Sequence, residues 1–217
     1  MNRGLSKGLM TIAALVMVSL ACSALSALGS GSLLNDNFEG EHTWGTGTDA
    51  DSSVEYSDGG LRVKIFKENY FVWSTPNDQD YENVHIEMKV INNGTDPTTA
   101  FGILCDQQTV SDSFYYLVMT PAGEYAIARA ALAAKDVFLT NNDQWASSDA
   151  IAHNKDSYQV GADCGNGTLT LYVDGQQIAS VTDSTYTKGN VGGLAWSGEN
   201  VASGDVTFDD FVVTQLK

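Results

Sequence analysis

Short runs of alternating apolar and polar residues, separated by turn signals, dominate the sequence after Leu33. The clearest run is 84–90, VHIEMKV, in which the two Val, Ile and Met share one face and His, Glu and Lys share the other. A period of two residues is that of a β-strand with one buried face. Because almost no helical period accompanies these runs, the chain can bury its apolar faces only by pairing and stacking strands.

An Asp-Gly pair at positions 174–175 lies between two strand-like runs, 169–173 and 178–181. A type I′ turn needs positive φ at both central residues, which Asp and Gly accept, so this segment predicts a β-hairpin. The whole pattern predicts roughly eleven to thirteen short strands. Many short antiparallel strands with glycine-rich turns form a two-sheet sandwich, so we expect an all-β jelly roll over residues 33–217, as one domain.

The first 22 residues have the composition of an export signal. Arg3 and Lys7 give a basic start, and the run 9–21 is apolar. An apolar run of this length is too short to cross a bilayer about 30 Å thick as a stable helix. We therefore expect residues 1–22 to direct export and to lie outside the folded domain.

The end of the signal decides where the protein resides. Residues 18–22, VSLAC, are similar to a bacterial lipobox, in which Cys22 would be lipidated and become the new N-terminus. Ser19 stands where Leu is usual, and an ordinary cleavage around residues 24–27 is the alternative. Residues 23–32 are small and flexible, typical of a tether. Both alternatives predict an exported protein, either a cell-surface lipoprotein or a secreted one, whose membrane contact is limited to a lipid anchor.

The two remaining cysteines, Cys105 and Cys164, form an even pair in an oxidising compartment. Both fall in strand-like segments, which favours a disulfide over two free thiols. A bridge closing a loop of roughly 60 residues would contribute about 4 kcal/mol.

The chain is strongly acidic, with a formal net charge of −16 at pH 7. Loss of Arg3 and Lys7 with the signal removes two positive charges and leaves −18. Nucleic acid and anionic lipid surfaces require a basic footprint, so neither is an expected partner. An acidic surface also serves as a solubility device in exported proteins.

No catalytic residue is predicted. A retaining glycosidase needs two carboxylates about 5 Å apart, but Glu87 stands alone between His85 and Lys89. No Gly-X-Ser-X-Gly elbow is present, which argues against a serine hydrolase. The other histidines, His42 and His153, are far from His85 in sequence and show no metal-ligand spacing.

Aromatic residues are the more informative class, because the apolar face of a sugar packs on a flat ring while its hydroxyl groups bond to neighbouring polar groups. Most aromatics of a sandwich fill its core, and Trp145 could equally be a plug over a sheet. His85 and Glu87 occupy the polar face of their strand and are ligand contacts or ordinary surface residues. The candidate ligand-binding residues are Trp73, His85, Glu87, Tyr115, Tyr125 and Trp196.

A structural calcium ion is a further expectation. The last strand changes its alternation between 206–208 and 211–213, which predicts a β-bulge at Asp209 and Asp210. First and last strands of such sandwiches often pair, and this would bring Asp36 close to that bulge. The three carboxylates could then offer oxygen ligands to Ca²⁺, or serve only as turn and bulge residues.

Several segments together resemble the concanavalin A-like lectin and glucanase sandwich, in particular its laminin-G-type and 3-keto-disaccharide hydrolase-like domains. The resemblance covers residues 34–216 and is carried by 36–38 (DNF) with Trp44, 102–105 (GILC), 114–116 (FYY), 164–175 (CGNGTLTLYVDG), 189–193 (GNVGG) and 208–211 (FDDF). It implies two curved antiparallel sheets, with glycans bound on the concave face or at its rim.

Three functions follow from these features. The first is a non-catalytic lectin-like module that binds carbohydrate, or another cell-surface polymer, on the concave sheet. The second is a glycoside-cleaving enzyme of the 3-keto-disaccharide hydrolase type, which a pocket with paired acids or a His-acid cluster would favour. The third is a structural subunit of a surface layer or appendage, built through edge strands.

Overall fold

The computed structural model describes residues 31–131, 134–201 and 203–216, so the signal segment 1–22 with Cys22 lies outside the described residues. No helix of the described part is long and apolar enough to cross a membrane. The strands are β1 Leu34–Asp36, β2 Gly47–Thr48, β3 Ser52–Ser57, β4 Gly60–Ile65, β5 Phe71–Ser74, β6 Val84–Asn92, β7 Ala100–Gln108, β8 Ser113–Met119, β9 Glu124–Ala130, β10 Val137–Phe138, β11 Ala146–Ser147, β12 Ser157–Gly165, β13 Thr168–Val173, β14 Gln176–Thr182, β15 Asn190–Trp196 and β16 Gly204–Gln215.

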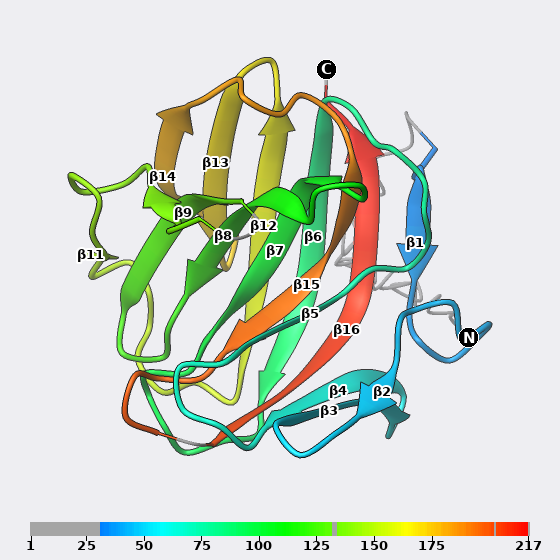
Figure 1. Ribbon diagram of the computed structural model, residues 1–217, viewed down its shortest axis with the longest axis vertical. Coiled ribbons are helices and arrows are strands. Elements are labelled where there is room, and N and C mark those ends of the chain that lie inside the picture. The colour runs from blue at the N-terminus through cyan, green and yellow to red at the C-terminus, as the bar shows by residue number, and fades with distance from the viewer. Residues whose placement is uncertain (1–30, 132–133, 202, 217) are drawn as a thin grey trace, which may run out of the picture.

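The strands form two antiparallel sheets that lie face to face (Figure 1). Sheet A has the order β14-β13-β12-β6-β16-β4-β3-β2, with β1 on β16, so the first and last strands pair as expected. Sheet B has the order β10-β9-β8-β7-β15-β5, with β11 on β9. The prediction of an all-β two-sheet jelly roll is confirmed.

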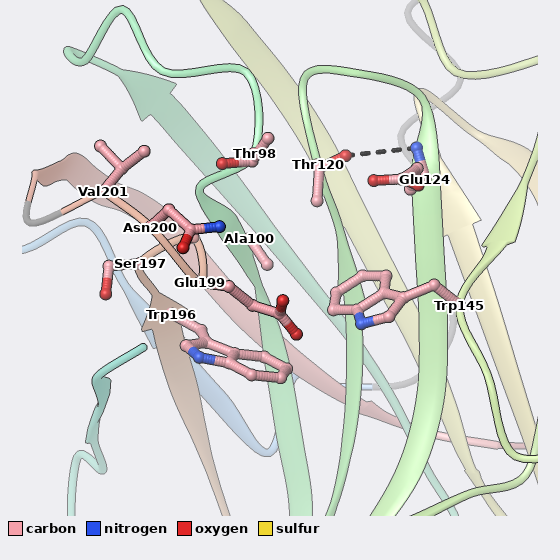
Figure 2. Close-up of a pocket in the computed structure, with 11 residues that line it drawn as sticks. Thr98, Ala100, Thr120, Glu124, Trp145, Trp196, Ser197, Glu199, Asn200 and Val201 are labelled. Carbon is pink, nitrogen blue, oxygen red and sulfur yellow. Dashed lines mark hydrogen bonds between the residues drawn. The ribbon is translucent and has the colours of Figure 1, made fainter. Parts of the chain in front are cut away.

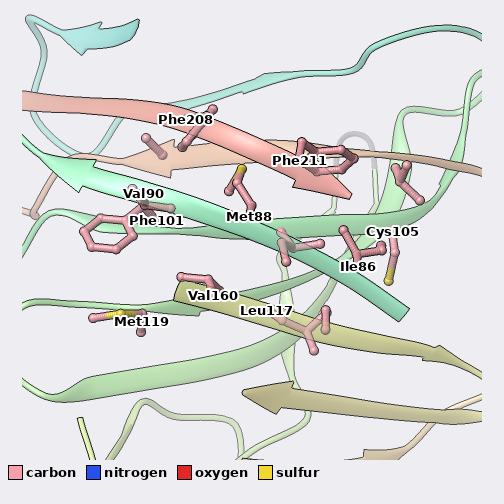
Figure 3. Close-up of a cluster of buried hydrophobic side chains, with 14 of the residues drawn as sticks. Ile86, Met88, Val90, Phe101, Cys105, Leu117, Met119, Val160, Phe208 and Phe211 are labelled. Carbon is pink, nitrogen blue, oxygen red and sulfur yellow. The ribbon is translucent and has the colours of Figure 1, made fainter. Parts of the chain in front are cut away.

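The core lies between the sheets and is fully apolar at its centre. Figure 3 shows Ile86 and Met88 of sheet A facing Phe101 and Leu117 of sheet B, with Phe208 beside them, and all five are fully buried. Burying each such side chain stabilises the fold by about 1.5–3 kcal/mol. The alternation in 84–90 holds throughout, because its apolar residues are buried while Glu87 is exposed.

Two local predictions are confirmed by the backbone. Asp174 and Gly175 have φ values of 51° and 76° and close the hairpin between β13 and β14. In β16 the register against β6 shifts between Asp209 and Val212, and Asp210 has a φ of 48°. This bulge lets residues on both of its sides face the core despite their odd spacing.

The predicted disulfide is also confirmed. Cys105 of β7 and Cys164 of β12 are bonded with an S–S distance of 2.02 Å, and both residues are fully buried. Because β7 belongs to sheet B and β12 to sheet A, the bond joins the two layers of the sandwich.

Candidate functional site

The outer face of sheet B, which is turned away from sheet A, is unusually apolar. In β8, Phe114, Tyr116 and Val118 belong to an apolar cluster on this face, whereas the residues between them pack into the inter-sheet core. Ala126 and Ala128 place small side chains beside them on β9. A strand that is apolar on both faces must be covered on both, so the outer face of sheet B requires partners of its own.

Aromatic rings supply that cover. Phe71 lies 6.2 Å from Trp196, Trp196 lies 5.7 Å from Trp145, and Trp145 lies 5.9 Å from Phe138, measured between ring centroids. Trp73 remains 38% exposed and lies 5.9 Å from Phe71. The aromatic cluster consists of Phe71, Trp73, Phe114, Tyr116, Phe138, Trp145 and Trp196.

The segment 137–147 crosses part of this face. Both of its short strands, β10 and β11, pair with β9, and this fixes the segment at the edge of sheet B. Phe138 and Trp145 then pack against the apolar outer face. Trp145 therefore plugs part of the sheet, which is one of the two alternatives that the sequence left open, and cavities remain on either side of Trp196.

The larger cavity has a volume of about 410 Å³ and is lined by Trp145 and Trp196. Glu124 at the start of β9 and Glu199 in the loop after β15 also line it. Figure 2 shows the Glu199 carboxylate directed toward the space between the two indole rings. Two flat rings beside exposed acidic oxygens suit a polyhydroxylated ligand, because the rings pack on its C–H groups and the oxygens accept from its hydroxyl groups.

The smaller cavity, of about 310 Å³, shares Trp196 with the larger one and extends to Trp73. Asp136 lines it, and its carboxylate accepts a hydrogen bond of 2.9 Å from the hydroxyl group of Tyr116. Burial raises the pKa of Asp136, although the bond from Tyr116 opposes this. Asn69 accepts a 2.9 Å bond from the Trp196 indole N–H and thereby holds that ring in place.

Hydrolysis would require two carboxylates on either side of one bond. Glu124 and Glu199 are the acids of the larger cavity, and both are exposed. Glu124 lies on β9, and Glu199 lies in the loop that follows β15. β9 and β15 are separated by β8 and β7, which places the two strand axes about 14 Å apart. The separation of about 5–9.5 Å used by glycosidases is reached only if both side chains turn toward each other.

The structure does not bring the six predicted ligand-binding residues together. Trp73 and Trp196 belong to the aromatic cluster. Tyr115 instead lies fully buried between the sheets, where burial and its hydrogen bond to Asp183 raise its pKa to about 12. Tyr125 is half-buried against the same core. The expectation that all six share one concave surface is therefore corrected.

His85 and Glu87 lie on the outer face of sheet A, on the opposite side of the sandwich from the aromatic cluster. His85 Nδ1 is 2.6 Å from Asp163 Oδ1, and Asp163 also accepts a 2.8 Å bond from the Tyr172 hydroxyl group. The bond to Asp163 raises the pKa of His85 despite its partial burial. Burial opposes ionisation of Asp163, yet the bonds from His85 and Tyr172 lower its pKa overall. This is a His-acid cluster, but it lines neither cavity of the aromatic face.

Replacement of His85 by Gln is expected to lower the free energy of unfolding by about 1 kcal/mol at pH 5.5 and by less at pH 8.5. Because the pKa of His85 is raised in the folded protein, the ion pair contributes its full stability below about pH 6.5, the ordinary pKa of His. This contribution disappears as the pH rises through the pKa that His85 has in the folded protein. The lowered pKa of Asp163 keeps the pair ionised above about pH 4. Urea unfolding at the two pH values measures the difference. Lys89→Gln, which removes the ion pair to Asp209 on the same face, is the control and should show no such change with pH.

Two of the three proposed calcium ligands, Asp36 and Asp209, have other partners. Asp36 accepts 2.8 Å bonds from the backbone N–H of Phe38 and from the indole N–H of Trp44. Asp209 pairs with Lys89 at 2.9 Å. No group of three or more His, Cys, Asp or Glu side chains able to hold a metal occurs among residues 31–131, 134–201 and 203–216. The bulge at Asp209 and Asp210 is therefore explained by strand geometry and an ion pair.

Sequence reasoning missed several residues of this face: Phe71, Phe114, Tyr116, Phe138, Asp136 and Glu199. The sequence does contain a signal for two of them, Phe114 and Tyr116. The run 114–119 is continuously apolar, and such a run indicates a strand that is covered on both faces. Nothing in the alternation identifies the covering segment 137–147, because its contacts depend on tertiary packing.

No protein-family model matches the sequence, and no curated protein matches it. Solved structures do match. A carbohydrate-binding module from Bacillus subtilis has a TM-score of 0.62 at 11% identity, with 80% of this chain and 96% of that chain covered. A Bacillus licheniformis β-glucanase has a TM-score of 0.56 at 12% identity, covering 86% of this chain and 100% of the other.

A κ-carrageenase from Pseudoalteromonas carrageenovora, solved with an oligotetrasaccharide of κ-carrageenan, is similar over 88% of this chain and 97% of the enzyme. Its TM-score is 0.58 and its identity is 12%. At these identities the likeness establishes the architecture alone. The chain therefore has the jelly-roll fold of the concanavalin A-like lectins and glucanases.

Proposed function

We propose that this protein is a non-catalytic, exported module that binds carbohydrate on the outer face of sheet B. The observation that carries the proposal is the gathering of three accessible indole rings, those of Trp73, Trp145 and Trp196, around two neighbouring cavities. Each cavity falls in the size range of small-molecule sites, about 300–1,000 Å³. Trp196 lines both cavities and is the central contact.

Three further observations support the proposal. The polar groups around the rings are mostly oxygen acceptors, including Asp112, Asp136 and Glu199, which match sugar hydroxyl donors. The buried disulfide fits a protein that folds in an oxidising compartment. Solved structures with the same architecture include a carbohydrate-binding module and a carrageenase in complex with an oligosaccharide.

Replacement of Trp196 by Ala is expected to weaken polysaccharide binding by about thirty-fold, which corresponds to about 2 kcal/mol for the loss of a central aromatic contact. Affinity electrophoresis in gels containing glucan, galactan, xylan or fructan measures the retardation that binding causes. The wild-type protein should be retarded by at least one of these polymers, and the Trp196→Ala variant should migrate as it does in an empty gel.

Phe66→Ala is the matched control, because Phe66 is 48% exposed but lines neither cavity. This variant should retain full retardation. Equal retardation of the wild-type and Trp196→Ala proteins, or equal loss in both variants, would contradict the assignment of the site.

A glycoside-cleaving enzyme is the second candidate, favoured by the presence of Glu124 and Glu199 in the same cavity. In that case the bound polysaccharide would release reducing ends, and Glu124→Gln or Glu199→Gln would abolish the release while leaving retardation intact. We expect no release from the wild-type protein, because Glu124 lies on β9 and Glu199 follows β15, and these two strands are about 14 Å apart. Release that both substitutions abolish would replace the first candidate with the second.

A further inference from the structure

A third cavity, of about 230 Å³, lies at the opposite end of β7 from the larger aromatic cavity. β7 begins at Ala100, which lines the larger cavity, and Asp106 near the other end of the strand lines the third one. The two residues are six steps apart along the strand, a distance of about 20 Å. The lining comprises Glu82, Asn83, Asp106, Asp183, the turn 165–169 and residues 186–187.

Asp106 is the unusual residue of this cavity. It is only 4% exposed, and its carboxylate accepts no hydrogen bond from any residue of the described part of the chain. Its backbone has a φ of 53° at a register shift in β7, a conformation that Asp and Asn adopt more readily than other side chains. The backbone geometry therefore explains why position 106 holds Asp or Asn, but it does not explain why the charged residue is present.

The charge around Asp106 is uncompensated. Burial and repulsion from Glu82 raise the pKa of Asp106 to about 6, so the carboxylate is ionised at neutral pH without a partner. Arg129 is committed to Asp183 at 2.7 Å, and Lys188 lies 3.7 Å from Asp80. A buried carboxylate normally pairs with a cation or coordinates a metal.

The amide oxygen of Asn83 adds a neutral hard ligand to the two carboxylates. Asn83 lines the cavity, and its Oδ1 accepts a 2.8 Å bond from the Asn166 backbone N–H, which leaves the second lone pair of that oxygen free. Gly165 makes this approach possible, because a Cβ there would lie 2.7 Å from Asn83 Cα and 2.8 Å from its Oδ1. Carboxylate and amide oxygens in irregular geometry suit Ca²⁺, whereas Mg²⁺ demands a near-ideal octahedron.

We propose that this cavity binds a divalent cation of the Ca²⁺ type through Asp106, Glu82 and Asn83. Only two carboxylates take part, so the affinity belongs to the weak range of extracellular sites, about 0.1–1 mM. The ion would tie β7 of sheet B to the start of β6 and to the turn between β12 and β13 of sheet A. The proposal is independent of carbohydrate binding, because no residue that lines the third cavity lines either cavity of the aromatic face.

Thermal unfolding of the EDTA-treated, dialysed protein with and without 10 mM CaCl₂ tests the site. The wild-type Tm should rise by about 5 °C, because an ion at ten or more times its Kd stabilises the folded state. MgCl₂ should raise it less. Asp106→Asn keeps the shape and the backbone preference of the residue, and this variant should not respond to CaCl₂. Glu82→Gln, at an exposed position, should respond less than the wild type and is a second variant if Asp106→Asn does not fold.

Asp209→Asn is the matched control, since it removes one negative charge from the outer face of sheet A. This variant should respond to CaCl₂ as the wild type does, and calorimetric titration with CaCl₂ should give the same Kd for both. An unchanged wild-type Tm in CaCl₂ would overturn the proposal. So would a response that Asp209→Asn removes and Asp106→Asn retains, because that pattern would place the ion at the bulge of β16.

Discussion

Removal of the disulfide, by the double substitution Cys105→Ala and Cys164→Ala, is expected to lower the free energy of unfolding by about 4 kcal/mol and the Tm by roughly 10 °C. The bond spans 59 residues, so its loss gives the unfolded chain many additional conformations. It also joins the two sheets directly, from β7 to β12. Urea and thermal unfolding under oxidising conditions measure the difference.

Reductant supplies the control. The wild-type protein unfolded in a strong reductant should lose the same stability as the double variant, whereas the double variant should be insensitive to reductant. Equal Tm values for the oxidised wild type and the double variant would contradict the account. A double variant that is less stable than the reduced wild-type protein would show that lost packing, and not only the lost cross-link, causes the effect.

Replacement of Asp106 by Asn is expected to stabilise the metal-free protein by about 3 kcal/mol at pH 8 and to have little effect at pH 4. The ordinary pKa of Asp is about 3.9, and in the folded protein burial and Glu82 raise it to about 6. A raised carboxylate pKa means that the folded state loses stability as the pH rises from about 4 to about 6. The Asn side chain does not ionise in this pH range, so the variant does not lose this stability.

Urea unfolding in EDTA at pH values from 4 to 8 follows this difference. The stabilisation should grow between pH 4 and pH 6 and stay constant above that. Asp163→Asn is the control of opposite sign, because the pKa of Asp163 is lowered, and this variant should lose stability above about pH 4. A difference between the wild type and Asp106→Asn that does not vary with pH would mean that the carboxylate pays no burial penalty.

Local sequence signals were sufficient to predict the fold. The alternation of residues 84–90, the Asp-Gly turn at 174–175 and the change of phase at 209–210 each depend on a few neighbouring residues, and the structure confirms all three. The pairing of Cys105 with Cys164 followed from counting the cysteines in a chain whose sequence predicts export. Such features are set by backbone geometry and composition, which a single sequence contains.

The site was harder to predict, for a physical reason. Alternation tells which residues of a strand share a face, but it does not tell which sheet the strand joins or what covers the face. His85 and Glu87 were correctly placed on the wetter face of β6, yet that strand belongs to sheet A, opposite the aromatic cluster. In β8 both faces are apolar, so Tyr115 and Tyr116 could not be told apart before the structure placed them.

The central claim, that carbohydrate binds on the outer face of sheet B, is tested most directly by the indole N–H signals of the four tryptophans. Trp44 is only 3% exposed and donates its indole N–H to Asp36 inside the protein, so its signal is an internal control. In ¹⁵N-labelled protein titrated with a polysaccharide that retards it, the signals of Trp73, Trp145 and Trp196 should shift while that of Trp44 stays in place. Saturation of binding with all four indole signals unmoved would contradict the central claim.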